Sequence, residues 1–197
     1  AKVLDILIYL QQQTPPIFHR DLSTSNILLD EDLNVYLIDF GFSSLGSKEV
    51  SASSVFQGTP GFIAPEQIIQ PTMASDIYGL GVSLVCLLAH KDINEVRAFT
   101  VADSPYQLDL KQLLPELHRQ ERQLFNWLKK MTNAKVSQRF PDAQAAKNVL
   151  PAVDFSDLST LADMCLNILP SKPTIFTTPG TSATPVPLSY INTSKNQ

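Results

Sequence analysis

The stretch from residue 17 to residue 41 constrains this chain most, because three polar residues recur in it at short spacing. They are Asp21, Asn26 and Asp39. Between the last two lie two apolar runs, separated by an acidic, Asn-containing turn, so residues 27–38 are predicted to form a β-hairpin. A hairpin would return Asp39 to the neighbourhood of Asn26. Carboxylate and amide oxygens placed together in this way can hold a metal-bound phosphate.

The composition predicts a soluble, globular chain with a core of its own. Of the 197 residues, 44% are hydrophobic, and this length favours one domain. The formal net charge is -4, and Lys and Arg form no run. We therefore expect no nucleic-acid partner and no binding to an anionic membrane surface, since both require a basic patch.

No membrane segment is expected in this sequence. Its longest apolar run, residues 79–89, is well short of the roughly 20 residues that a spanning helix needs. The sequence begins at Ala1 within an amphipathic pattern, which shows no signal peptide and indicates a piece of a longer protein. Cys86 and Cys165 are far apart and lack metal-ligand spacing, so free thiols and a cytoplasmic location are expected.

Apolar residues at helical spacing predict that most of the remaining chain is α-helical. Helices are expected over residues 2–12, 77–89 (capped by Ser75 or Asp76), 116–130, and from a cap at Asp142 to about residue 150. Residues 91–115 are expected to be irregular, because two X-Pro steps interrupt them. One further helix is expected within residues 151–170, and residues 171–197, rich in Pro, Ser and Thr, are predicted to be a disordered tail.

Three motifs in a fixed order make the sequence resemble the protein kinase family, of the Ser/Thr type. They are His19-Arg20-Asp21 with Asn26 five residues after the Asp, Asp39-Phe40-Gly41, and the segment 58–66, which ends in Ala64-Pro65-Glu66. Any one motif would be weak evidence, but their order and intervals leave coincidence a small alternative. The resemblance covers residues 1–150. It implies a kinase-like large lobe, mainly α with one or two short β-hairpins, and with the small β-rich lobe absent.

The resemblance assigns a role to each of the three polar residues. Asp39 would bind the Mg²⁺ that bridges the terminal phosphates of ATP, and Asn26 would hold a second Mg²⁺. Asp21 would orient the hydroxyl of a protein substrate and accept its proton. Taken alone, each residue is more simply explained as a loop Asp or Asn that caps a turn, but the joint motif reverses those odds.

The resemblance also implies residues that hold the site together. His19 and Phe40 would pack in an apolar spine, Asp76 would hydrogen-bond the backbone around His19 and Arg20, and a late arginine would pair with the Glu of Ala-Pro-Glu. The structural residues implied are His19, Phe40, Gly41, Glu66, Asp76 and Arg139.

Residues 39–66 correspond to the activation segment, and their interior is rich in serine. In similar kinases an arginine before the catalytic Asp, here Arg20, receives a phosphate from this segment, which suggests control by phosphorylation. The candidate phosphosites are Ser43, Ser44, Ser47, Ser51, Ser53 and Ser54. An unmodified loop explains the same composition equally well.

Two residues bear on the acceptor class. Thr59 resembles the threonine that Ser/Thr kinases set against the catalytic Asp, which favours Ser or Thr acceptors over Tyr. Ser23 departs from the family, because Ser/Thr kinases usually carry a Lys there that contacts the terminal phosphate. This departure bears on the transfer rate and, less strongly, on the acceptor class.

Two functions remain open at the level of sequence. No Gly-x-Gly-x-x-Gly loop precedes His19, and the upstream Lys2 lies in a predicted helix and not in a Val-Ala-Ile-Lys strand. The chain is therefore expected to be either the large lobe of a Ser/Thr kinase, which needs a small lobe or an upstream segment to cover ATP, or a catalytically inactive, truncated kinase-like protein that acts by binding.

Overall fold

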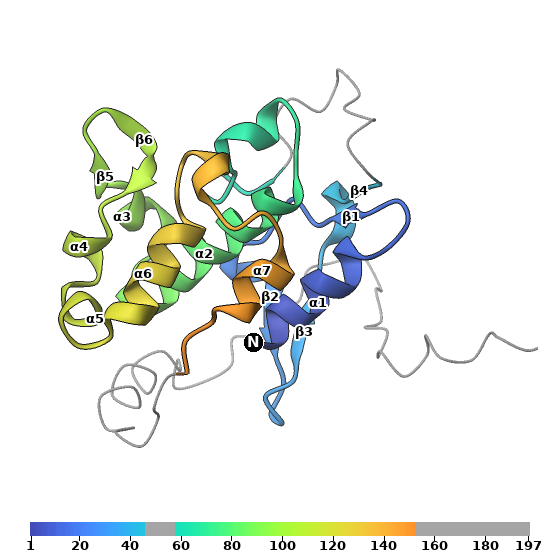
Figure 1. Ribbon diagram of the computed structural model, residues 1–197, viewed down its shortest axis with the longest axis horizontal. Coiled ribbons are helices and arrows are strands. Elements are labelled where there is room, and N and C mark those ends of the chain that lie inside the picture. The colour runs from blue at the N-terminus through green and yellow to red at the C-terminus, as the bar shows by residue number, and fades with distance from the viewer. Residues whose placement is uncertain (46–57, 153–197) are drawn as a thin grey trace, which may run out of the picture.

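The computed structural model describes residues 1–45 and 58–152, in which helices gather around one central helix (Figure 1). The α-helices are α1 (Lys2–Gln11), α2 (Met73–Ala89), α3 (Ile93–Arg97), α4 (Leu110–Leu113), α5 (Pro115–Gln120), α6 (Arg122–Met131) and α7 (Ala143–Asn148). The strands are β1 (Ile17–Phe18), β2 (Ile27–Leu29), β3 (Val35–Leu37), β4 (Ser44–Leu45), β5 (Thr100–Val101) and β6 (Ser104–Leu108). Short 3₁₀ turns are η1 (Thr24–Asn26), η2 (Phe40–Phe42), η3 (Pro65–Ile68) and η4 (Val136–Gln138).

Helix α2 is the centre of the core, and α3, α4, α6 and α7 all contact it. It is buried on nearly all sides in its first three turns, which matches its almost continuous apolar sequence. Gly81 allows α6 to approach closely, since a Cβ there would lie only 2.8 Å from the Cβ of Met131. Gly79 likewise faces Leu22, whose carbonyl oxygen would lie 3.0 Å from a Cβ at position 79. Both glycines of α2 therefore allow close packing of neighbouring segments.

The start of α2 was placed too late by the sequence pattern. The helix begins at Met73 and is capped by Thr72, whose backbone N–H bonds to Ser75 Oγ in a capping box. Neither Ser75 nor Asp76 is therefore the cap. Asp76 lies inside the first turn and is buried, which leaves its carboxylate free to bond a segment outside the helix.

The predicted hairpin is present as β2 and β3, with Leu28 opposite Tyr36. Its turn is stabilised by Asp30, whose two carboxylate oxygens accept hydrogen bonds from the backbone N–H of Asn34 at 2.7 Å and the hydroxyl of Tyr36 at 2.9 Å. After the hairpin, the N–H of Ile38 donates to the carbonyl of Asn26 at 3.0 Å. The hairpin therefore returns the chain to Asn26, as the sequence predicts.

Two other parts of the sequence prediction were wrong. Residues 91–115 are not irregular, because Asp92 caps α3 and residues 100–108 form the β5–β6 hairpin, in which Pro105 sits beside a register shift. The single helix expected over residues 116–130 is divided into α5 and α6 at Glu121, whose backbone leaves the helical region (φ -118°, ψ 61°). The side chain of Asp142 does cap α7, by accepting from Ala145 N–H at 2.7 Å.

The extra helix expected up to residue 170 and the tail expected at residues 171–197 lie outside the described residues, apart from residues 151 and 152. Across residues 1–45 and 58–152, no helix is both long and apolar enough to span a membrane.

Candidate active site

Asp76 anchors the loop that carries His19, Arg20 and Asp21. Its two carboxylate oxygens accept hydrogen bonds from the backbone N–H groups of His19 at 2.9 Å and of Arg20 at 2.8 Å. These bonds hold Arg20 in the left-handed region (φ 69°), a strained conformation for a residue other than glycine. Burial raises the pKa of Asp76 to about 6, opposed by the two amide donors and by the charge of Arg20. The loop is thus fixed to the first turn of the central helix.

Asp21 is held from two sides and is only 5% exposed. Asn26 Nδ2 donates to Asp21 Oδ2 and to the Asp21 carbonyl, both at 2.9 Å. The backbone N–H of Thr59 donates to the other carboxylate oxygen, Oδ1, at 2.6 Å. Both carboxylate oxygens of Asp21 are therefore fixed by donors from other residues. Among the described residues, Thr59 thus contacts Asp21 through its backbone N–H and not through its hydroxyl.

Asp39, which follows the β2–β3 hairpin, is exposed. It adopts a left-handed backbone (φ 60°), and its Oδ1 accepts from the Gly41 N–H at 3.2 Å. A Cβ at position 41 would approach that oxygen to 3.0 Å, so Gly41 leaves the carboxylate room. The exposed carboxylate can thus face a ligand that arrives from solvent.

The oxygen donors present fit Mg²⁺. Both hydrogen bonds of the Asn26 side chain use Nδ2, and within the described part of the chain no donor bonds to its Oδ1. That amide oxygen and the exposed Asp39 carboxylate are hard ligands of the type that Mg²⁺ prefers. The hydrogen bond from the Ile38 N–H to the Asn26 carbonyl places Asn26 beside the residue that precedes Asp39. The side chains of Asn26 and Asp39 therefore belong to adjacent backbone segments.

His19 packs and does not face a substrate. Its ring lies 4.6 Å from the Phe40 ring, measured between centroids, and its Nε2 lies 3.1 Å from the Ile38 carbonyl. Burial lowers the pKa of His19, so the imidazole is neutral at pH 7 and Nε2 can donate to that carbonyl. His19 thereby contacts both residues that flank Asp39, and Phe40 remains 41% exposed.

Arg20 is buried, yet its guanidinium makes no hydrogen bond or ion pair within residues 1–45 and 58–152, and its Nε is sealed from solvent. Burial lowers its pKa, opposed by the charge of Asp76. Of the candidate phosphosites, Ser43 is half-buried and donates its hydroxyl to the Phe40 carbonyl at 2.6 Å. Ser44 forms part of β4. Ser47, Ser51, Ser53 and Ser54 lie outside the described residues.

The pairing expected between Glu66 and Arg139 is present. Arg139 Nη1 and Nη2 donate to the two oxygens of Glu66 at 2.7 and 3.1 Å, in the two-pronged geometry that strengthens such pairs. Arg139 also donates to the carbonyls of Ala74 and Asn133. The pair therefore joins the segment after Thr59 to α2 and to the turn before η4.

Two supporting residues were missed by the sequence analysis. Gln67 Nε2 donates to the Arg20 carbonyl at 2.6 Å, and Ser75 Oγ donates to Glu66 Oε1 at 2.8 Å. Both residues are buried, although their types are usually exposed. Their adjacency to Glu66 and Asp76 was the only sequence signal, and it does not reveal which distant group each one contacts.

A buried carboxylate that is bonded to an amide donor, together with an exposed carboxylate on the adjoining backbone segment, defines a class of site suited to phosphoryl transfer. Comparison with known proteins agrees, because the protein kinase domain family matches residues 1–150. The chain belongs to the protein kinase family.

Similarity to individual proteins is confined to shorter segments. The chain is 49% identical over 81 residues to wall-associated receptor kinase-like 15 of Arabidopsis thaliana, a match that covers 40% of this chain and 13% of that protein. It is 39% identical over 93 residues to receptor-interacting serine/threonine-protein kinase 3 of Homo sapiens, covering 44% of this chain and 18% of that protein. The chain thus spans less than a fifth of the length of these curated relatives.

Proposed function

We propose that this chain is the substrate-side lobe of a Ser/Thr protein kinase and, once a second lobe covers ATP, supplies the residues that direct the terminal phosphate of ATP to a protein hydroxyl. The observation that carries the proposal is the double restraint of Asp21 by Asn26 and Thr59. A carboxylate fixed in this way can orient a hydroxyl and take its proton, whereas a loop Asp that merely caps a turn needs no second partner from a distant segment.

Mg²⁺ and ATP would be held opposite Asp21 by Asn26 Oδ1 and the Asp39 carboxylate. The metal, when bound, neutralises charge that develops on the transferred phosphate. The chain itself would position these oxygens in two ways. The Ile38 N–H donates a hydrogen bond to the Asn26 carbonyl, and the His19 ring packs against the Phe40 ring. The two relatives above are both named as kinases, and one as a serine/threonine-protein kinase, which supports the acceptor class.

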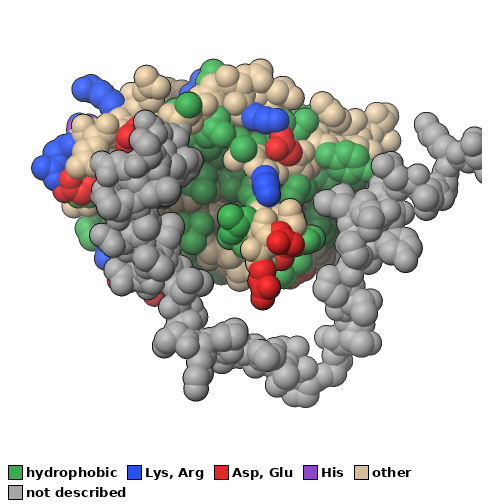
Figure 2. Space-filling view, turned by 90° about the horizontal axis from the view of Figure 1, so that it is seen from below, with side chains coloured by type: hydrophobic (Ala, Val, Ile, Leu, Met, Phe, Trp, Pro, Cys, Tyr) green, Lys and Arg blue, Asp and Glu red, His purple; other side chains and the backbone are tan. Residues whose placement is uncertain are grey.

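A second, smaller lobe, from an upstream segment or another chain, would cover ATP. Supporting this, six large apolar side chains are exposed along the hairpin and η2, the elements that flank Asp39: Leu28, Leu29, Leu33, Ile38, Phe40 and Phe42. Figure 2 shows hydrophobic side chains on the lower face around a central column of Lys, Arg, Asp and Glu side chains. Lys2 cannot replace a phosphate-binding lysine while its Nζ donates to the Leu33 carbonyl at 2.8 Å.

Arg20 would be the receptor of a phosphate on the activation segment. A buried guanidinium without a partner among the described residues supports this, because an unpaired buried charge is costly. Intact-mass analysis with site mapping of active protein tests it. Full activity without phosphate on residues 43–54 would contradict it.

A cytoplasmic location remains a proposal that rests on cysteine usage, with Cys86 buried and free.

A non-catalytic, binding function is the second candidate, and Ser23 favours it. Ser23 is buried and its hydroxyl lies 2.8 Å from that of Ser25, so this position offers no cation to a terminal phosphate. Transfer of labelled phosphate from Mg-ATP to a mixed protein substrate, by the protein that carries this chain together with its ATP-covering lobe, separates the two candidates. We expect phosphoserine and phosphothreonine as products, and none with Asp21→Asn. Mg-ATP binding without transfer by that two-lobed protein would favour the binding function, and phosphotyrosine would overturn the acceptor class.

A further inference from the structure

The peptide group between Arg20 and Asp21 is held at both of its ends. Its carbonyl accepts a hydrogen bond from Gln67 Nε2 at 2.6 Å, and its N–H donates to His19 Nδ1 at 3.3 Å. The preceding N–H, that of Arg20, donates to Asp76 at 2.8 Å. Because a peptide group is planar, partners at its two ends restrict the direction in which the Asp21 side chain leaves the backbone.

Gln67 reaches this peptide group from a distant segment, the 3₁₀ turn η3. It is 4% exposed, and burial of a side-chain amide is costly unless a hydrogen bond compensates for it. The plainer explanation is that this bond only stabilises the fold. What indicates a role in the site is where the bond ends, on Arg20, which precedes Asp21 and has a left-handed backbone (φ 69°).

The segment that carries Gln67 approaches the same loop at two further points. Gly58 passes so close that a Cβ there would lie 2.9 Å from the Arg20 carbonyl oxygen. The next residue, Thr59, donates its N–H to Asp21 Oδ1 at 2.6 Å. Gln67 therefore completes a set of contacts around Arg20 and Asp21 that all come from one segment.

The backbone of Gln67 is itself anchored. The neighbouring Glu66 forms the two-pronged pair with Arg139 and accepts a hydrogen bond from Ser75 Oγ at 2.8 Å. The Gln67 N–H donates to the Ala64 carbonyl at 3.0 Å. The side-chain amide thus extends from a fixed point of the fold, as a group that positions another residue must.

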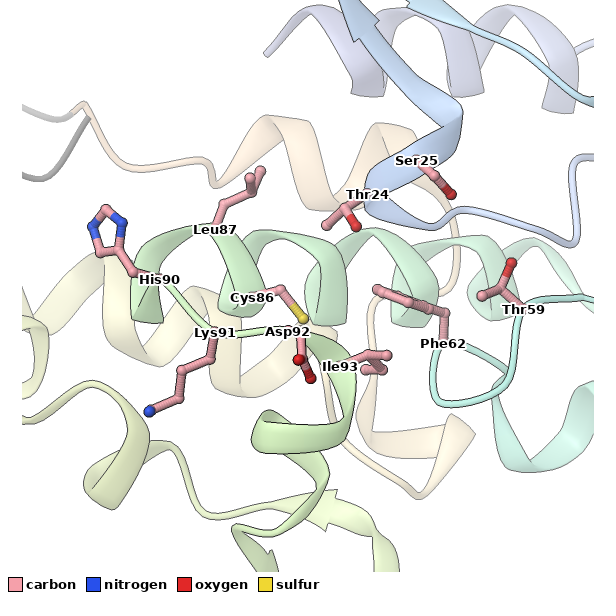
Figure 3. Close-up of a pocket in the computed structure, with 10 residues that line it drawn as sticks. All are labelled: Thr24, Ser25, Thr59, Phe62, Cys86, Leu87, His90, Lys91, Asp92 and Ile93. Carbon is pink, nitrogen blue, oxygen red and sulfur yellow. The ribbon is translucent and has the colours of Figure 1, made fainter. Parts of the chain in front are cut away.

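These contacts matter because the two segments border the same space. Figure 3 shows Thr24 and Ser25, which follow Asp21 in the chain, on one side of this space, and Thr59 and Phe62 on another. A shift of one segment relative to the other would move Asp21 relative to any group bound there. A displacement of about 1 Å in an active site can lower a rate about 100-fold.

We propose that Gln67 is a positioning residue for Asp21: its amide fixes the Arg20 carbonyl and so keeps the Asp21 carboxylate on the Thr59 amide, directed at the acceptor. The inference rests on the proposed function, because it takes Asp21 as the proton acceptor. In this role Gln67 touches neither the substrate nor the metal. It acts through the backbone of Arg20.

The first test uses this chain alone and requires no catalysis. Gln67→Met keeps the length of the side chain and removes the amide donor. Gln11→Met is the matched control, because Gln11 is also buried (7% exposed) and its Nε2 also donates to a backbone carbonyl, that of Met73, at 3.2 Å. Hydrogen exchange of the Thr59 amide, compared with the amides in the middle of α2, measures how firmly Asp21 is held.

We expect the Thr59 amide to exchange about tenfold faster in Gln67→Met than in the parent chain, because its acceptor is no longer held in place. A general loss of stability would also speed the exchange of the α2 amides, so only the excess at Thr59 counts. Gln11→Met should show no such excess. Unchanged exchange at Thr59 in Gln67→Met, or the same excess in both variants, would overturn the proposal.

The second test measures phosphate transfer by the protein that carries this chain together with its ATP-covering lobe. We expect Gln67→Met to lower kcat about tenfold and to leave the KM for Mg-ATP unchanged, since Asp21 lies on the acceptor side. Gln11→Met should leave both constants unchanged. An unchanged kcat in folded Gln67→Met, or equal losses of kcat in the two variants, would overturn the proposal.

If Gln67→Met does not fold, Gln67→Asn takes its place, because it keeps a polar side chain but withdraws the amide from the Arg20 carbonyl. The same loss of kcat is expected, and an unchanged kcat would again overturn the proposal. Failure of the proposed function gives a different result. Faster Thr59 exchange in the Gln67 variant, with no transfer by the two-lobed parent, would leave the positioning of Asp21 standing and remove the catalytic function.

Discussion

The two carboxylates of the candidate site are held very differently. Asp21 is buried, and both of its oxygens accept hydrogen bonds, one from Asn26 and one from Thr59. Asp39 is exposed, and within the described residues it accepts one bond, from its near neighbour Gly41. The proposed acceptor side is therefore held by a distant segment of this chain as well as by Asn26, whereas the proposed nucleotide side depends on local backbone geometry. We infer that the nucleotide side is completed by a further lobe.

The Glu66–Arg139 pair gives the largest expected effect, because it supports the organised side. Glu66→Ala leaves Arg139, whose side chain is fully buried, without its carboxylate. Loss of one partner of a buried pair costs about 3–5 kcal/mol, and the remaining carbonyl acceptors of Arg139 place this variant near the lower end. Urea denaturation measures the change in the free energy of unfolding.

The control for this variant is Glu116→Ala, which removes an exposed pair with Arg119. It should change the free energy of unfolding by about 0.5 kcal/mol or less. Equal effects of the two variants would mean that the buried pair does not support the site.

The next effect is a pH dependence at the anchor of the catalytic loop. The pKa of Asp76 is raised from 3.8 to about 6, so the folded state holds its proton more tightly than the unfolded state does. The stability that this group contributes is therefore greatest below pH 4 and falls as the pH rises to about 6. The difference of about 2.2 pH units corresponds to about 3 kcal/mol.

Asp76→Asn removes this titration. The variant should therefore lose more free energy of unfolding, relative to the parent chain, at pH 4 than at pH 7. His19 has a lowered pKa and contributes stability that is lost as the pH falls, but both proteins carry it and its effect cancels in the difference. Denaturation curves at the two pH values provide the measurement. A penalty independent of pH would show that Asp76 stays ionised throughout.

A smaller effect separates nucleotide binding from chemistry. Asp39→Ala should weaken Mg²⁺-dependent ATP binding about tenfold, because it removes a proposed metal ligand while leaving the fold intact. Titration calorimetry compares it with Asp21→Asn, which should bind nucleotide as the parent does. Loss of binding in Asp21→Asn alone would reverse the assignment of the two sides.

The smallest effect is expected on the exposed hairpin. Leu29 is 64% exposed, so Leu29→Ser should change the free energy of unfolding by less than about 0.5 kcal/mol. Leu128→Ala, at a fully buried position of α6, should cost about 2–5 kcal/mol. A large loss of stability from Leu29→Ser would show that this face is already packed in the isolated chain.

The features that the sequence predicted well are local in the chain. The β2–β3 hairpin follows from two apolar runs and a turn, and the cap at Asp142 follows from one residue before a helix. The start of α2 was missed because the Thr72–Ser75 capping box precedes the apolar run that marked the helix. The structure of residues 91–115 was missed because α3 and β5 are too short to show a periodic pattern.

For the site, the motifs predicted which residues matter but not how each is held. The contact of Thr59 with Asp21 through its backbone N–H could not be read from the threonine side chain. Gln67 was missed for a related reason, since its partner is a backbone carbonyl, which any residue provides. Contacts between distant segments depend on packing around α2, and that packing leaves no short pattern in the sequence.

The most direct test of the central claim is the rate of phosphate transfer at saturating Mg-ATP for the protein that carries this chain together with its ATP-covering lobe, and for its Asp21→Asn variant, with nucleotide binding measured on the same samples. If the acceptor side is organised around Asp21 as a proton acceptor, the variant should bind nucleotide normally and transfer phosphate about 10²–10⁴-fold more slowly. Equal transfer rates in the two proteins would contradict the claim.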